Sequence, residues 1–154
     1  MNAVFVCVGA LLFALFSGVG CATVQRPPAD RLMVIVPFEH ALFTPDDPRF
    51  PDGPQIAVLW GDPSSGPSTM LIKVKKGPMP LHSHSSDYHL VVIRGMAKHW
   101  EDGQTEDQVQ TLSPESYWFQ PGNKIHGDSC LSDECIVHIV WLGKRDGKLA
   151  PTRR

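Results

Sequence analysis

Short apolar and β-branched runs alternate with proline- and glycine-rich breaks along most of the chain. Runs of this kind, recurring roughly every ten residues, are typical of sandwiches and barrels rather than of alternating strands and helices. No segment after the N-terminal region shows a long helical period. The expected strands are Gln55–Trp60, Thr69–Lys75, His89–Arg94, Ala97–Trp100, Gln108–Leu112, Ser116–Gln120 and Cys135–Leu142. The pattern therefore predicts an all-β fold with few or no helices beyond the N-terminal leader.

The breaks between these runs have the composition of tight turns. Residues 61–67, 76–80 and 121–123 are rich in proline, glycine, serine, aspartate or asparagine, which supply the fixed or positive backbone dihedrals that turns require. Residues 38–54 are dense in proline and aspartate, and we expect a surface arm there rather than a strand pair. The 14 prolines and 13 glycines of the whole chain would repeatedly interrupt helices.

The N-terminus has the pattern of an export signal. No charged side chain occurs from Met1 to Gln25, and Ala3 to Val19 is an apolar run of the length of a secretory h-region. Small residues directly before Cys21 resemble a bacterial lipobox, which implies cleavage there and a lipid anchor on Cys21 as the only membrane contact. Plain secretion, an uncleaved anchor and a buried core helix remain alternatives, and all but the last predict an exported protein, periplasmic or membrane-anchored.

Length and composition fit one domain after this leader. The chain has 154 residues, of which 42% are hydrophobic, enough for one core. We expect a signal peptide over residues 1–21, a linker over 22–36, a domain over 37–148 and a tail over 149–154. The formal net charge is −2, with no run of like charge, so electrostatics give no reason to expect nucleic acid as a partner.

Histidines supply the candidate chemistry. Three of the seven lie close together, at His82, His84 and His89. Side chains two apart on a strand share a face, so His82 and His84 can point into one pocket. His89 would need a turn at 85–87 to join them, and His126 follows the turn at 121–123. The sequence thus predicts a metal site of His82, His84, His89 and His126, with Asp87 as a reserve ligand.

The same residues resemble the two motifs of the cupin superfamily. The first motif corresponds to Gly77, His82, His84, His89 and Gly95, and the second to Pro121, Gly122 and His126. In finer detail, the chain resembles small cupins related to ChrR-type anti-sigma factors and to acetylacetone-cleaving dioxygenases. The segments that carry this likeness are 60–63, 82–84, 116–122 and the cysteine-containing segment after His126. The resemblance implies a double-stranded β-helix, or jelly-roll barrel, and the homodimers that are common among cupins.

The resemblance also implies a function. It predicts one divalent transition metal, whether iron, zinc, nickel, copper or manganese, and oxygenase or isomerase chemistry on a small chelating substrate. Imidazole ligands disfavour magnesium and calcium. Two other roles stay open: a sensing or binding module without catalysis, and a metal that only stabilises the barrel. The histidines could also be solvated surface residues, or the cupin site could be empty.

Several other residues have two interpretations. Cys130 and Cys135 either form a short-range disulfide or are independent thiols. His138 either lines the barrel or is a satisfied core histidine. Tyr88 and Gln120, each beside a motif, are candidates for supporting the ligands. The aromatic side chains either wall a pocket or pack the core, and they are Trp60, Trp100, Trp118, Trp141, Tyr88, Tyr117 and Phe119.

Overall fold

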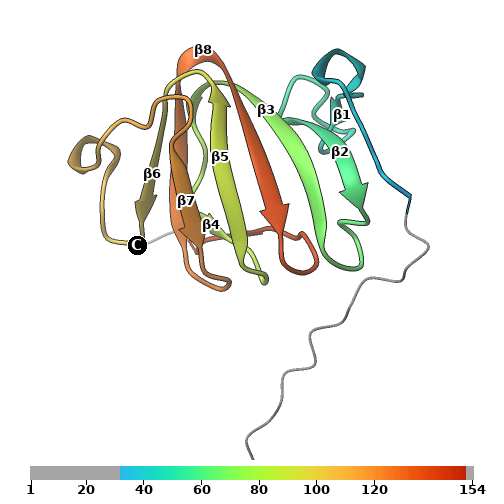
Figure 1. The fold of residues 1–154 in the computed structure, drawn as a ribbon. Helices are drawn as coiled ribbons and strands as arrows, with labels where there is room; N and C mark the ends of the chain where they lie inside the picture. The colour runs from blue at the N-terminus through green and yellow to red at the C-terminus, as the bar shows by residue number, and fades with distance from the viewer. Residues whose placement is uncertain (1–31, 152–154) are drawn as a thin grey trace, which may run out of the picture. The chain divides into compact units, whose positions relative to one another are not determined.

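Antiparallel strands dominate the structure, a computed structural model that describes residues 32–151 (Figure 1). The strands are β1 (Thr44–Pro45), β2 (Gln55–Gly61), β3 (Ser68–Pro78), β4 (His82–Ser83), β5 (Tyr88–Arg94), β6 (Ala97–Glu101), β7 (Tyr117–Gln120), β8 (His126–Trp141) and β9 (Lys148–Leu149). Within the described residues, helix is limited to two 3-10 turns, η1 (Phe38–His40) and η2 (Glu106–Gln108). The predicted all-β class is confirmed.

The structure describes no part of the N-terminal leader. The expected signal peptide, Cys21 and most of the expected linker lie outside the described residues. Contacts divide the chain into two units, and all the strands belong to the second, which begins at Val34. In the part of the chain that the structure describes, no helix has the length and apolar character needed to span a membrane.

Strand β8 organises the sheet. Its length allows it to pair with β3 and β4 along one edge and with β5 and β6 along the other. A register shift in β3 between Lys75 and Gly77, where Gly77 has φ +130°, marks the point at which the pairing bends. The sheet consequently curls into a half-barrel (Figure 1).

Six of the seven expected strands are present, and one expectation is wrong. The segment expected as strand Gln108–Leu112 contains the end of η2 and a single β-bridge from Leu112 to Ala97. A capping box explains the difference, because the Thr105 side chain caps the first turn and the Gln108 side chain bonds back to the Thr105 amide. The expected arm at 38–54 also contains a short strand, since β1 pairs with β2.

The two faces of the curled sheet pack differently. On the concave face, buried Met70, Leu90, Ile139 and Trp141 form one apolar cluster with Tyr88. On the opposite face, a second cluster of Ala57, Leu71 and Ile136 packs against Ala41 and Phe43 of the arm. Each fully buried large apolar side chain contributes about 1.5–3 kcal/mol. The concave face therefore has a firm apolar floor, and the candidate site lies at its edge.

Candidate metal centre

Three histidines converge at one end of the concave face. His82 on β4 pairs with His126 on β8, and His84 is the first residue after β4. Their potential ligand atoms all lie within 4.8 Å of one another. The His82 and His126 ring centroids are 4.4 Å apart, and that of His84 lies 4.8 Å and 5.3 Å from them. The fold thus brings His126 next to His82 and His84, from which it is distant in sequence.

Backbone carbonyls orient all three rings in the same way. The Nδ1 atoms face the carbonyl oxygens of Pro80 at 2.8 Å for His82, of Asp146 for His84 and of Lys124 at 3.0 Å for His126. A carbonyl oxygen only accepts hydrogen bonds, so each Nδ1 carries the proton and donates it. Each Nε2 therefore keeps its lone pair. This is the arrangement in which an outer hydrogen bond fixes the tautomer of a metal-binding histidine.

The structure does not bring His89 to this group. Along β5, Tyr88 points into the concave face, so its neighbour His89 points to the opposite face. There its Nδ1 lies 2.7 Å from the Tyr117 hydroxyl and its ring packs on Phe119. The turn at 85–87 does not change this alternation. The Asp87 carboxylate instead accepts a hydrogen bond from the Gly122 amide, so the reserve ligand also lies apart from the three histidines.

Sequence reasoning missed Asp128, which lies beside the three rings. Its Oδ2 atom is 3.7 Å from Nε2 of His82 and 3.9 Å from Nε2 of His126. Its Oδ1 atom accepts a hydrogen bond from Nδ1 of His99 at 2.6 Å. The signal was available, because Asp128 follows His126 by two positions on β8 and so shares its face.

Gln120 contacts the other nitrogen of the His99 ring, the one that does not face Asp128. Its amide nitrogen faces the carbonyl oxygens of Pro121 and Lys124, which leaves its Oε1 atom 2.9 Å from Nε2 of His99. Both ring nitrogens of His99 thus face acceptors, the Asp128 carboxylate and the Gln120 amide. The His99 ring is therefore held between Gln120 and Asp128, which fixes its contact with the carboxylate.

Burial decides the charges in the centre. It lowers the pKa of His126 to about 4 and also lowers the pKa of His84. Burial alone would raise the pKa of Asp128, but the hydrogen bond from His99 and the neighbouring histidines lower it overall. Near neutral pH, His84 and His126 are therefore neutral donors and Asp128 is a carboxylate. Burial raises the pKa of Tyr88, so its hydroxyl, 3.3 Å from Nε2 of His126, stays protonated.

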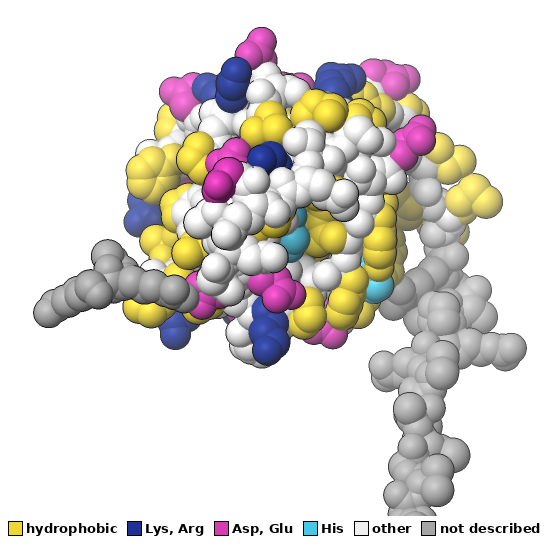
Figure 2. All heavy atoms as spheres, turned by 90° about the vertical axis from the view of Figure 1, so that its left-hand side faces the viewer, with side chains coloured by type: hydrophobic (Ala, Val, Ile, Leu, Met, Phe, Trp, Pro, Cys, Tyr) yellow, Lys and Arg dark blue, Asp and Glu magenta, His cyan; other side chains and the backbone are white. Residues whose placement is uncertain are grey.

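His82 and His84 open onto a pocket of about 690 Å³, and the fully buried His126 lies behind them. The apolar wall of the pocket comes from the concave face and consists of Ile72, Val74, Leu90, Val137 and Ile139, with Trp118 and Trp141. Figure 2 shows a hollow on this side of the molecule, with histidine and hydrophobic side chains visible inside it. His138 is not part of the wall, because it lies on the other face and its Nε2 is 2.6 Å from the Thr69 hydroxyl.

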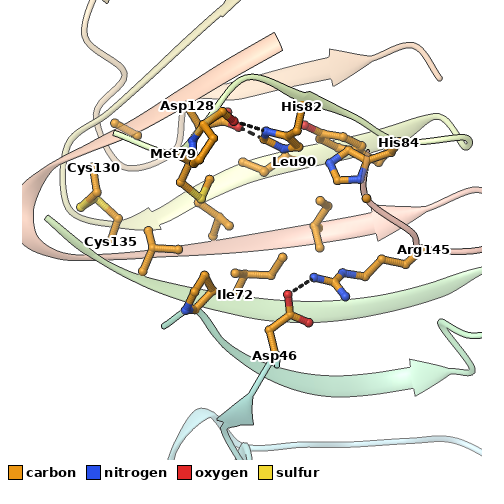
Figure 3. Close-up of a pocket in the computed structure, with 18 of the residues that line it drawn as sticks. Asp46, Ile72, Met79, His82, His84, Leu90, Asp128, Cys130, Cys135 and Arg145 are labelled. Carbon is orange, nitrogen blue, oxygen red and sulfur yellow. Dashed lines mark hydrogen bonds and ion pairs between the residues drawn. A yellow bond between two sulfur atoms is a disulfide. The ribbon is translucent and has the colours of Figure 1, made fainter. Parts of the chain in front are cut away.

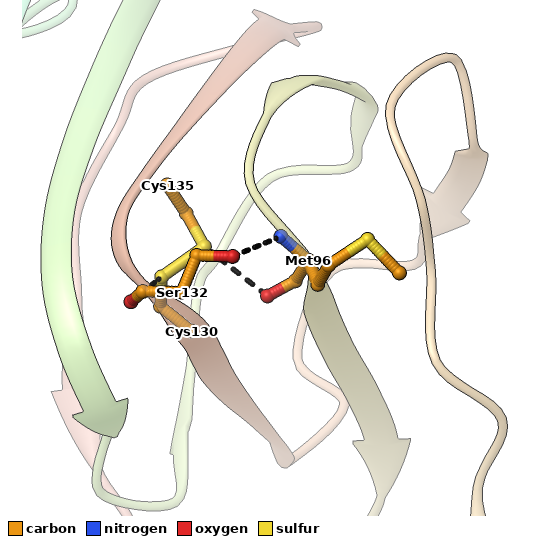
Figure 4. Close-up of a disulfide and its surroundings, with 4 residues drawn as sticks. All are labelled: Met96, Cys130, Ser132 and Cys135. Carbon is orange, nitrogen blue, oxygen red and sulfur yellow. Dashed lines mark hydrogen bonds between the residues drawn. A yellow bond between two sulfur atoms is a disulfide. The ribbon is translucent and has the colours of Figure 1, made fainter.

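Cys130 and Cys135 form a disulfide, which decides between the two interpretations of the sequence. The bond joins residues of β8 whose Cα atoms are 5.8 Å apart. The disulfide lines the pocket away from the histidines (Figure 3). Between the cysteines, the Ser132 hydroxyl accepts a hydrogen bond from the Met96 amide at the start of the adjacent β6 hairpin (Figure 4).

Known proteins support the fold. An RmlC-like cupin from Ralstonia eutropha JMP134 is 15% identical over 71% of this chain and 68% of that chain, with a TM-score of 0.57. The polyketide cyclase RemF from Streptomyces resistomycificus is 17% identical over 79% of this chain and 88% of that chain, with a TM-score of 0.61. The DMSP lyase DddQ from Ruegeria pomeroyi DSS-3 is 16% identical over 76% of this chain and 60% of that chain, with a TM-score of 0.55.

Sequence comparison gives the family. No curated protein matches the chain. Residues 50–153, which include all three clustered histidines and Asp128, match the family model described as a domain of unknown function, DUF4437. The chain therefore belongs to the DUF4437 family, and its fold is that of the RmlC-like cupins.

Proposed function

We propose that the protein binds one divalent transition metal through the Nε2 atoms of His82, His84 and His126 and acts on a small chelating molecule in the adjoining pocket. One observation carries the proposal: three histidines, each with its Nδ1 proton held by a backbone carbonyl, bring their ligand atoms within 4.8 Å of one another beside a pocket of about 690 Å³ that His82 and His84 line. Imidazole nitrogen suits iron, zinc, nickel and copper.

Asp128 is the proposed fourth donor. Two ligands that each lie about 2.1 Å from one ion are separated by roughly 3.0–3.4 Å. The Asp128 Oδ2 atom is only slightly farther than this from Nε2 of His82 and of His126, at 3.7 and 3.9 Å. The hydrogen bond from His99 holds the other carboxylate oxygen and so fixes its direction. With this carboxylate, an ion that takes five or six ligands would still be able to accept a donor atom from a substrate.

The surrounding residues define what the site can do. When bound, the ion would act as a Lewis acid toward an oxygen or sulfur donor of the substrate. The protonated Tyr88 hydroxyl, beside His126, can donate a hydrogen bond to the same ligand. The apolar wall of the pocket would pack against the apolar part of the substrate and exclude water from it. Oxygenase or isomerase chemistry on a small chelating compound fits these elements, and the cyclase and the lyase of the same fold support catalysis as the role.

The first experiment measures metal content and turnover. The full chain is purified without a metal-chelating tag, and metal per chain is compared in wild type, His84→Ala and His89→Ala. Because His89 lies on the opposite face, we expect about one ion per chain in wild type and in His89→Ala, and more than about a hundredfold loss of affinity in His84→Ala. Equal loss in both variants, or none in either, would refute the metal site.

Catalysis is tested on the metal-loaded protein. Oxygen consumption and isomerisation are followed with diketones, enols and thiols. Redox-active iron or copper with turnover supports the enzymatic role. Inert zinc that no small molecule perturbs would instead support a metal that only stabilises the fold, and reversible ligand binding without turnover would support a sensing module. The open pocket beside the histidines favours the first outcome, because a purely structural site needs no cavity.

We also propose that the protein is exported and anchored by a lipid on Cys21. The pattern of the N-terminal sequence is the main argument, and the Cys130–Cys135 disulfide supports it, since such bonds persist in oxidising compartments. Mass spectrometry of the protein from a bacterial membrane fraction is expected to find an acylated N-terminal Cys21. An intact Met1 on a protein in the cytoplasm would contradict the proposal.

A further inference from the structure

An ion pair between two separate segments of the chain lies in the pocket near the metal centre. Arg145, in the segment between β8 and β9, donates from Nη2 to the Asp46 carboxylate at 2.6 Å. Asp46 directly follows β1 and belongs to the arm. Both residues line the pocket, and Figure 3 shows the Arg145 side chain reaching across it toward Asp46, on the side where His84 lies.

Arg145 has hydrogen-bonding capacity that this pair does not use. Its Nε atom is buried without a partner, and the guanidinium has five N–H donors in a planar fork. A second arginine at the pocket, Arg49, differs in this respect. Its Nε and Nη2 atoms both bond the Asp47 carboxylate, and its side chain is 82% exposed. Arg145 is therefore the arginine that a carboxylate could bind with two parallel hydrogen bonds.

The position of Arg145 couples it to the metal centre. The next residue, Asp146, accepts the Nδ1 hydrogen bond of His84 through its carbonyl and two bonds from Ser85 through its carboxylate. His84 and Arg145 both line the pocket, so a small molecule bound there could contact both at once.

We propose that the pocket selects a small organic carboxylate with an apolar body, and that Arg145 binds its carboxylate by exchanging Asp46 for it. Asp46 would act as an internal carboxylate that holds Arg145 in position until the ligand arrives. The apolar wall of Ile72, Val137 and Ile139 takes the rest of the molecule. This names the substrate class of the proposed metal site and rests on that proposal for the chemistry, although binding at Arg145 needs no metal.

The test uses straight-chain carboxylates from butanoate to decanoate and their primary amides as neutral controls. Binding to the full chain is measured by calorimetry, with and without zinc. We expect each carboxylate to bind about tenfold more tightly than its amide, because hydrogen bonds to charged groups are the stronger ones. Affinity should rise roughly fourfold for each added methylene until the pocket is full.

Variants of three residues test whether Arg145 causes the preference for a carboxylate over its amide. Arg145→Met should abolish the preference for the acid over the amide, and Arg145→Lys should retain part of it, because lysine has the charge without the fork. Asp46→Asn should strengthen carboxylate binding several-fold, since the internal competitor is lost. Arg49→Gln is the matched control and should change the preference by less than twofold. Thermal melting checks that each variant folds.

The outcomes separate this inference from the metal proposal. Equal affinity for acids and amides, no binding of any carboxylate up to millimolar concentration, or an unchanged preference in a folded Arg145→Met variant would overturn it, even if the protein binds metal. Conversely, carboxylate binding that depends on Arg145 in a protein that takes up no metal would uphold it and refute the metal site.

Discussion

At the residue scale, backbone carbonyls decide what the histidines can do. Pro80, Lys124 and Asp146 each fix the Nδ1 proton of one ring, so the chain itself, rather than solvent, selects the tautomer that leaves Nε2 free. Burial then keeps His126 neutral at ordinary pH, because it lowers the pKa of this residue to about 4.

This pKa predicts how stability depends on pH in the metal-free protein. His126 titrates near 6.5 when unfolded and near 4 when folded, so between these values the unfolded chain binds more protons. The stabilising contribution is complete above about pH 7 and is lost as the pH falls toward 4. The lowered pKa values of His84 and His138 add to the same trend. Urea unfolding at a series of pH values should therefore give a free energy of unfolding that falls steadily below pH 6.5.

Two variants test whether His126 causes this dependence of the free energy of unfolding on pH. His126→Gln should reduce it, whereas His40→Gln, at an exposed position, should leave it unchanged. A free energy of unfolding that stays level from about pH 7 to pH 5 would contradict the burial of neutral imidazole.

Asp128 predicts a second measurable effect. If its carboxylate is a metal donor, Asp128→Asn should weaken metal binding by roughly 10- to 100-fold, as for other changes close to a metal. Asp133→Asn, an exposed change on the same strand, is the control and should have no effect. Competition with a chelator of known affinity measures both. Equal affinities in the two variants would exclude Asp128 from the site.

Part of the site was predictable from these residues. Spacing on a strand identified His82 and His84, and the motif after the turn at 121–123 identified His126, because both depend on local geometry. The outward direction of His89 was not predictable, since it depends on whether the turn at 85–87 shifts the alternation of β5. Asp128 lies outside both motifs, and only its position on the same face of β8 as His126 brings it to the site.

At the element scale, strand β8 begins earlier than its composition indicates. Apolar periodicity predicts a strand from Cys135, yet β8 starts at His126. The polar residues at 127–129 pair with β6, and Trp100 packs over Gly127. Long-range pairing thus creates the half of β8 that holds His126 and Asp128. Conversely, the local capping box at 105–108 prevented the expected strand at 108–112.

Gly127 tests this account of β8. A Cβ atom there would lie 2.4 to 2.6 Å from the Trp100 ring, and a buried ring cannot move away easily. Gly127→Ala should therefore lower the free energy of unfolding by about 1–3 kcal/mol and also weaken metal binding. Gly66→Ala, where nothing lies within 4 Å, is the matched control. Chemical denaturation compares the two, and equal stabilities would show that Trp100 does not hold this part of the strand.

At the scale of the domain, curvature gives the antiparallel sheet a concave face that can hold a ligand. Register shifts bend β2, β3 and β5, and the apolar arm covers the outer face. The inner face is left to form the pocket, with the histidines at one end. The cupin motifs predicted this architecture, whereas the part of the arm at Asp46 has no motif and its pairing with Arg145 follows only from the folded chain.

X-ray absorption spectroscopy of the zinc-loaded protein tests the central claim most directly, because it detects the atoms bound to the ion. We predict scattering from three imidazole rings with nitrogen at about 2.0–2.1 Å. His82→Ala should remove one ring, and His89→Ala should leave the spectrum unchanged. A spectrum without imidazole scattering, or one that loses a ring in His89→Ala, would contradict the site described for this protein.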